Sequence, residues 1–289
     1  MDPLVARKTW RTLEPLHGLI YFTPEVAEEY AAVGLPDSSG YFAFRAAPMG
    51  PVAGEVVVAT FFNFSPTLVR AAIPSAWDVA APEVLVAARL RAADRALIRI
   101  LGASAGGSDV ARAADLARVA ADAACEHTAG RALFAGHATL PWPDEPHLVL
   151  WHAQTLLREF RGDGHVSVLT AEGLGPVEAL VIHAATGDVP ASVLRSTRGW
   201  DDLSWEAGVE SVRRRGWLEP GDALALNDAG RSHRQTVEDR TDLLAVAAYA
   251  ALGDERCAEL RALARPLSKS VVDGGALGVS PPGGARAPG

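Results

Sequence analysis

Residues 158–169, REFRGDGHVSVL, place two arginines, an aspartate and a histidine around two glycines. Gly162 and Gly164 permit a positive φ angle, which most other residues avoid. The carboxylate of Asp163 can accept hydrogen bonds from the backbone N–H groups at the start of a helix. We therefore predict that Gly162, Asp163 and Gly164 form a structural turn between two helices.

Histidines flank the predicted turn, with His152 before it and His165 after it. Imidazole exchanges protons near neutral pH, and the positive end of a helix favours its neutral form. We predict His152 and His165 as catalytic acid–base residues and Arg158 as the group that binds a ligand carboxylate or phosphate. The structural alternatives remain open: a hydrogen-bonded core histidine, a helix cap, and a salt bridge from the arginine to Glu159 or Asp163.

The N-terminal segment supplies further polar groups beside many aromatic residues. Residues 4–21 are predicted to form a helix, and Glu14, His17 and Tyr21 share one of its faces because they are spaced i, i+3 and i+7. An apolar cavity with a few polar groups suits a hydrophobic small molecule. We predict that the substrate-binding residues are His17, Tyr21, Tyr41, Arg45 and Arg158. Core packing is the alternative for the aromatic rings.

Metal and cofactor signatures are absent from the sequence. There is no His-x-x-x-His pair, Cys-x-x-Cys pair, Gly-rich phosphate loop or Gly-x-Ser-x-Gly elbow. Cys125 and Cys257 are expected to be idle thiols. We therefore expect no metal and no cofactor. A metal or haem site assembled across helices from His17, His152 and His165 remains an alternative.

Composition narrows the class of protein further. A chain of 289 residues that is 49% hydrophobic is long enough for two domains. Its formal net charge is −8, with only two lysines, so no general attraction to nucleic acid or anionic lipid is expected. We find no uncharged apolar run of about 18 residues and no signal peptide. A cytoplasmic protein without membrane contact is expected.

Helical periodicity predicts a mainly α fold. We expect a helical domain at 1–163, a winged-helix-like domain at 164–265 and a disordered Gly/Pro-rich tail at 266–289. Within the second domain, three short helices at about 176–185, 190–196 and 201–215 precede a small β-hairpin around Pro220, Gly221 and Asp222, which is the layout of a winged helix-turn-helix. A long helix follows, from which we expect a homodimer contact.

The third helix of that layout carries the wrong charge for a DNA reader. Asp201, Asp202, Glu206 and Glu210 lie at its start, where phosphate would be met, so nucleic-acid binding is not expected. The three arginines at 213–215 complement the C-terminal end of the helix. A ligand-responsive DNA-binding transcriptional regulator stays open as the alternative, because the layout and these arginines favour it.

Several segments carry a resemblance to a known family. WRTLEPLHGLIYFTPE, GYFAFRAAPMGPV, FFNFSPTLVRAAIPSAW, LPWPDEPHLVLWHAQTLLREFRGDGHVSVL and RGWDDLSWEAGVESVRRRGWLEP resemble the SalK-type helix-turn-helix family of actinobacteria. The resemblance extends to about Leu263, and LLREFRGDGH is its most specific block. It implies a winged-helix-like C-terminal part and a setting that includes antibiotic gene clusters, and it transfers no catalytic residues.

The main hypothesis combines these observations. We expect a small-molecule-binding protein of specialised, antibiotic-type metabolism that performs cofactor-independent acid–base chemistry at a site between the two domains.

Overall fold

The computed structural model describes residues 1–277, and within that range the chain is helical and contains no β-strand. The helices are α1 (Pro3–Gly18), η1 (Leu19–Tyr21), α2 (Pro24–Ala32), α3 (Asp37–Ala46), η2 (Ala47–Met49), α4 (Gly54–Thr60), α5 (Pro66–Ala72), α6 (Ala76–Val79), α7 (Pro82–Leu101), η3 (Gly102–Gly106), α8 (Ser108–Cys125), α9 (Ala132–Ala138), α10 (Pro146–Ala171), α11 (Pro176–Ala184), α12 (Ala191–Arg198), α13 (Asp202–Arg214), α14 (Asp228–Ala250) and α15 (Gly253–Asp273). The predicted mainly α class is confirmed.

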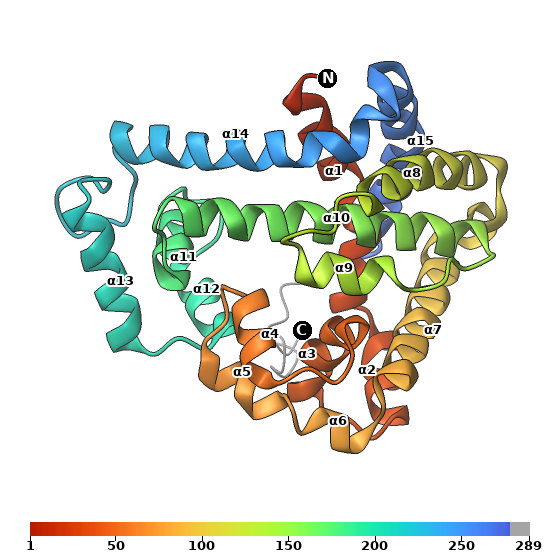
Figure 1. The fold of residues 1–289 in the computed structure, drawn as a ribbon, viewed down its shortest axis with the longest axis horizontal. Helices are drawn as coiled ribbons and strands as arrows, with labels where there is room; N and C mark the ends of the chain where they lie inside the picture. The colour runs from red at the N-terminus through yellow and green to blue at the C-terminus, as the bar shows by residue number, and fades with distance from the viewer. Residues whose placement is uncertain (278–289) are drawn as a thin grey trace.

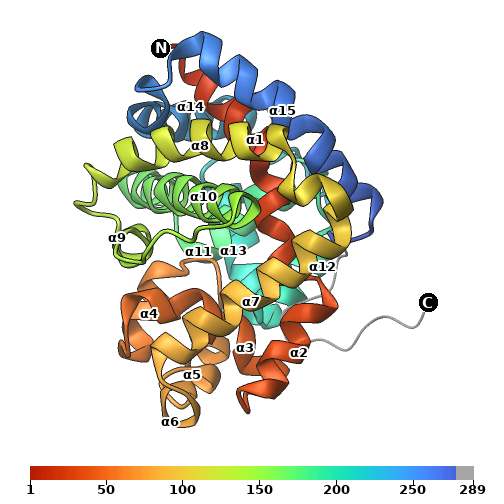
Figure 2. The ribbon, with the colours of Figure 1, turned by 90° about the vertical axis from the view of Figure 1, so that its right-hand side faces the viewer.

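Helix α10 lies at the centre of the molecule. It packs against α1, α7, α8, α9 and α14, and Figure 1 shows it running below α14, with α9 beneath it. Most of its side chains are buried, including Trp151, Leu156 and Phe160. Figure 2 shows the other helices grouped around it. The surrounding helices are therefore positioned mainly by this one helix.

The buried apolar side chains form two clusters. The first contains residues from α1 to α10 together with the end of α14 and α15, and we call these helices the helical body. The second extends from Val168 to Val237 and is built largely on α11, α12 and α13, which we call the three-helix unit. In Figure 1 this unit lies at the left end of α10. The domain division expected at residue 163 falls inside α10, which contributes to both clusters.

The predicted turn at Gly162, Asp163 and Gly164 is wrong. Helix α10 passes through all three residues without a break and ends only at Ala171, before Gly173 with its positive φ of 64°. Two interior glycines cost about 0.5–1 kcal/mol each relative to alanine. Burial of apolar side chains on both sides of them, such as Phe160 and Val168, outweighs this cost.

Tertiary contacts explain why this sequence occurs inside a helix. Asp163 does cap a helix, but a different one: its Oδ2 accepts a hydrogen bond of 3.0 Å from the N–H of Phe134 in the first turn of α9. Gly164 leaves room for Arg131, whose Nη1 donates to the carbonyl of Phe160 at 2.7 Å. The motif is therefore a helix-to-helix contact.

The predicted β-hairpin is also absent from the described residues. The segment between α13 and α14 contains one isolated antiparallel bridge between Leu218 and Leu226. The N–H of Glu219 donates to the carbonyl of Ala225 at 2.9 Å, but the N–H of Ala225 donates to the carbonyl of Ala223 at 3.1 Å and not back to Glu219, so the ladder is not extended. A loop closed by one bridge takes the place of the wing.

The C-terminal part departs from the expected tail. Helix α15 continues to Asp273, so residues 266–273 are helical, because Leu267 and Val271 are buried against the first cluster. Residues 274–277 form a turn, and the rest of the predicted tail, 278–289, lies outside the described residues. Among residues 1–277, no single helix is long and apolar enough to cross a membrane, although two strongly bent helix pairs reach that length together.

The two glycines of α10 give a matched pair for a stability test. Replacing Gly162 by alanine should stabilise the protein by about 0.5–1 kcal/mol, since the new Cβ would lie at an ordinary 3.6 Å from Glu159. In Gly164→Ala the Cβ would lie 2.7 Å from Nη1 of Arg131. We expect this substitution to lower the free energy of unfolding by about 0.5–1.5 kcal/mol, because it disturbs the hydrogen bonds of Arg131. Urea denaturation measures both, and equal stabilisation by the two substitutions would contradict this account.

Candidate functional site

A cavity in three adjoining chambers lies between the helical body and the three-helix unit. Trp10 of α1 and Arg198 of α12 line all three chambers. We name the chambers after one lining residue each: the His165 chamber of about 510 Å³, the Tyr21 chamber of about 610 Å³ and the Glu159 chamber of about 240 Å³. The two larger volumes lie in the range that holds small molecules.

Most of the residues predicted from the sequence lie at this cavity. His165 lines the His165 and Glu159 chambers, Tyr21 lines the Tyr21 chamber, Tyr41 and Arg158 line the Tyr21 and Glu159 chambers, and Arg45, Gly162 and Asp163 line the Glu159 chamber. His17 is fully buried and contacts Tyr21. His152 and Gly164 line none of the three.

His152 does not join His165 in one site. The two histidines are separated by 13 positions on the unbroken helix α10, which places them about 20 Å apart along its axis. His152 packs edge-on against Trp142 with ring centroids 4.8 Å apart. Burial and the cations Arg89 and Arg118 lower its pKa to about 4. The two histidines predicted as a catalytic pair are therefore too far apart to act together on one substrate.

His165 is held in one tautomer. Its Nδ1 lies 2.9 Å from Oγ1 of Thr241, and that hydroxyl donates its own proton to the carbonyl of Val237 at 2.7 Å. The hydroxyl must then accept from the imidazole, so Nδ1 carries the hydrogen and Nε2 has a free lone pair. No described residue hydrogen-bonds to Nε2. Burial lowers the pKa of His165 to about 4, and Glu238 offsets only part of this, so the ring is neutral at pH 7.

His17, which is fully buried, is held by the same kind of hydrogen bond to a threonine. Its Nδ1 lies 2.9 Å from Oγ1 of Thr155, which donates to the carbonyl of Trp151. Nε2 of His17 therefore accepts the proton of the Tyr21 hydroxyl across 2.7 Å. Burial and the cation of Arg158 hold the pKa of His17 well below its usual range. This chain of hydrogen bonds fixes the hydroxyl of Tyr21 at the wall of the Tyr21 chamber.

The arginines predicted to bind substrate are already neutralised by carboxylates. Arg45 donates two hydrogen bonds to Glu159, at 3.2 and 2.9 Å, and Arg158 donates to both Glu14 and Glu159 at 2.9 Å. Burial raises the pKa of Glu159, but these two guanidinium groups outweigh it and hold the pKa well below its usual range. Arg158 therefore lacks the unpaired charge that an anion site requires.

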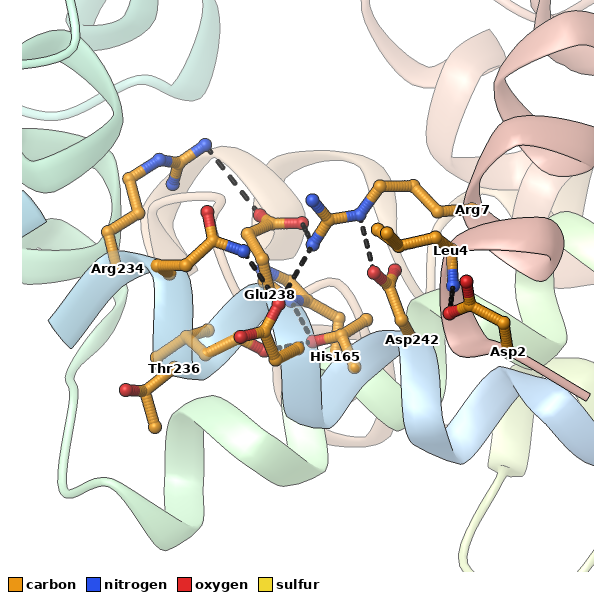
Figure 3. A network of polar contacts seen from close by, with 12 residues as sticks. Asp2, Leu4, Arg7, His165, Arg234, Thr236, Glu238 and Asp242 are labelled. Carbon is orange, nitrogen blue, oxygen red and sulfur yellow. Dashed lines mark hydrogen bonds and ion pairs between the residues drawn. The ribbon is translucent and has the colours of Figure 1, made fainter. Parts of the chain in front are cut away.

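A second set of ion pairs lines the His165 chamber (Figure 3). Glu238 on α14 lies between Arg161, at 3.2 Å, Arg7, at 3.6 Å, and Arg234, at 3.7 Å. Asp242, one turn later on the same helix, accepts from Arg161 at 2.9 Å. The cations on this side of the cavity are therefore paired as well.

Arg198 is the cavity residue that sequence reasoning missed. It ends α12, has no carboxylate within 4.0 Å among the described residues, and donates its one protein hydrogen bond to Oγ1 of Thr197. Its guanidinium lies 4.8 Å from the ring centroid of Phe64. Burial lowers its pKa. In the sequence this residue looks like an ordinary basic helix end, because nothing there indicates that it points inward.

The described residues contain no group of three His, Cys, Asp or Glu side chains placed to hold a metal ion. The metal site considered from His17, His152 and His165 fails on geometry, since His17 and His165 donate to separate threonines and His152 lies far along α10.

Helices α12 and α13 follow one another closely, separated by a short turn at Gly199. Residues 6–278 match the model of the helix-turn-helix family. The chain belongs to the helix-turn-helix family. No curated protein and no solved structure matches it. The cavity lies against α12, which lines it with Leu194 and Arg198.

The buried histidine of the cavity predicts a pH dependence of stability. The pKa of His165 is about 4 when folded and near 6.5 when unfolded, so the unfolded state binds more protons between these values. The free energy of unfolding should fall as the pH is lowered through this window, by up to about 1.4 kcal/mol per pH unit for this residue. His165→Asn should show a shallower dependence in urea titrations from pH 7 to 4.5. His127→Asn, at an exposed position, serves as the control, and equal slopes in all three proteins would refute the assignment.

Proposed function

We propose that this protein binds an apolar small molecule in the cavity and that Nε2 of His165 accepts a proton from it. The observation that carries the proposal is the setting of His165: the residue lines two chambers, its imidazole is neutral at pH 7, and its hydrogen bond to Thr241 leaves Nε2 as the acceptor nitrogen. Proton abstraction by a positioned imidazole requires no cofactor.

The Tyr21 chamber supplies the surface that an apolar ligand needs. Its wall combines the aromatic rings of Tyr21, Phe22 and Tyr41 with the aliphatic side chains of Val189 and Val193. Burying such surface stabilises a complex by roughly 25 cal/mol per Å² before the costs of association. The ligand would lie in this chamber and reach towards His165 past Trp10, which lines all three chambers.

The finer assignment follows the family resemblance. The resemblance to SalK-type actinobacterial members supports a role in specialised, antibiotic-type metabolism. A homodimer through the closing helices and a cytoplasmic location belong to the same proposal.

Histidine modification tests the proton acceptor directly. Diethyl pyrocarbonate acylates neutral imidazole at an accessible nitrogen, so His165 should react at pH 6.5, and His17, whose two ring nitrogens are both hydrogen-bonded, should not. Peptide mass spectrometry locates the adducts. Saturation with the apolar dye N-phenyl-1-naphthylamine should slow the reaction of His165 at least several-fold while leaving exposed His127 unchanged. An unreactive His165, or one that the dye does not protect, would refute the proposal.

A ligand-responsive DNA-binding regulator is the second candidate, and membership of the helix-turn-helix family is the observation that favours it. The charges of α13 oppose it. Asp202, Glu206 and Glu210 form an exposed stripe at i, i+4 and i+8, which would repel phosphate. The arginines at 213–215 already contact the carbonyl of Gly221 and the carboxylates of Glu210 and Glu178.

The two candidates differ in their response to DNA at low salt. Fluorescence anisotropy with random-sequence duplexes in 20 mM salt should show no binding of the wild-type protein, because phosphate attraction is strongest there and α13 opposes it. A variant with Asp202, Glu206 and Glu210 all changed to lysine should gain salt-dependent binding if α13 is the surface that would meet DNA. Tight binding by the wild-type protein would favour the regulator over the enzyme.

A further inference from the structure

We infer that the molecule bound in the cavity carries an anionic group, a carboxylate, sulfonate or phosphate, and that Arg198 of α12 binds it. This inference rests on the proposed function, since it names the chemical class of the ligand for the same cavity. It moves the anion-binding role from Arg158, where the sequence suggested it, to a residue at the end of α12.

The cavity wall contains one half-buried arginine that no carboxylate of the described residues balances. The other buried or half-buried arginines there each have a carboxylate partner within 4.0 Å: Glu159 and Glu14 on one side, Glu238 and Asp242 on the other. Arg198 has no such partner among residues 1–277, and Arg11, which also has none, is exposed. A half-buried guanidinium without an anion is costly, because burial removes its hydration without replacing it.

Arg198 is also held in place for such a contact. Its backbone carbonyl accepts a hydrogen bond of 2.8 Å from the N–H of Ser65, and the neighbouring indole of Trp200 donates to the carbonyl of Asn63 at 2.9 Å. The guanidinium stacks on Phe64 and uses only Nη1 within the protein. Its remaining N–H donors are free to form the paired hydrogen bonds with which arginine recognises carboxylates and related anions.

The position of Arg198 within the cavity suits the same role. Arg198 lines all three chambers, so an anion on it lies between the apolar Tyr21 chamber and the His165 chamber. A ligand with its anion there can place its apolar part against Tyr21 and Phe22 and still present a C–H, N–H or O–H group towards His165. Binding of the anion by Arg198 would place the proton-donating group of the ligand close to His165, and proton transfer requires such positioning.

Two fluorescent dyes of nearly the same shape test this inference. 8-Anilinonaphthalene-1-sulfonate carries an anion, and N-phenyl-1-naphthylamine is its uncharged counterpart. The wild-type protein should bind the sulfonate at least about tenfold more tightly than the neutral dye. Arg198→Met should abolish this preference without changing the affinity for the neutral dye, which also shows that the cavity is intact. Arg198→Lys should retain part of the preference, because it keeps the charge and loses the paired donors.

Arg195→Met is the matched control. Arg195 is on the same helix but pairs with Asp202 outside the cavity, so this variant should behave as wild type. Equal affinity of the wild-type protein for both dyes, or a preference that survives in Arg198→Met, overturns the inference and leaves the proposed function standing. Failure of the wild-type protein to bind either dye overturns the proposed function, and this inference with it.

Discussion

Glu159 is almost completely removed from water, with 1% of its surface exposed, and it keeps its negative charge only because Arg45 and Arg158 surround it. Removal of one partner from a buried ion pair typically costs about 3–5 kcal/mol, since the other charge is left unpaired. The three residues come from α3 and α10, and Glu14 adds α1 through Arg158. This group of charges therefore fixes the helices that form one side of the cavity, and the side chains that open into the cavity depend on it.

The central error of the sequence interpretation concerns Gly162, Asp163 and Gly164. Local propensity favours a turn at two glycines around an aspartate, but the deciding contacts are with Phe134 and Arg131, about 30 positions earlier in the chain. Periodicity alone located most other helices, including α11, α12 and α13, because their apolar positions repeat within a single segment. The predicted hairpin is absent because the N–H of Ala225 donates to the carbonyl of Ala223 and not across to Glu219, a contact that no pattern in the sequence indicates.

The candidate site was predictable to the extent that its residues share a helix. Spacing predicts Glu14, His17 and Tyr21 on one face of a helix over residues 4–21. In the structure α1 ends at Gly18 and Tyr21 lies in η1, yet all three residues still lie at the cavity or directly behind it. Hydrogen-bond partners that are distant in the sequence could not be predicted in this way. Thr241, for example, sets the tautomer of His165 from 76 positions away. Arg89 is a further case, a buried cation 5.1 Å from the ring centroid of Trp151 that no pattern in the sequence distinguishes from a surface arginine.

Helix α10 has 26 residues, so it is about 39 Å long, and it enters both hydrophobic clusters. A continuous helix bends little, and it therefore prevents the two hydrophobic clusters from separating by a hinge motion. A guest molecule has to enter by a smaller displacement. Helix α12 is the wall suited to this movement, because it has only eight residues and its backbone hydrogen bond to the helical body, from Ser65 to the carbonyl of Arg198, lies at its C-terminal end. The route of entry would then be a short helix that pivots about Arg198 while the frame of the molecule stays still.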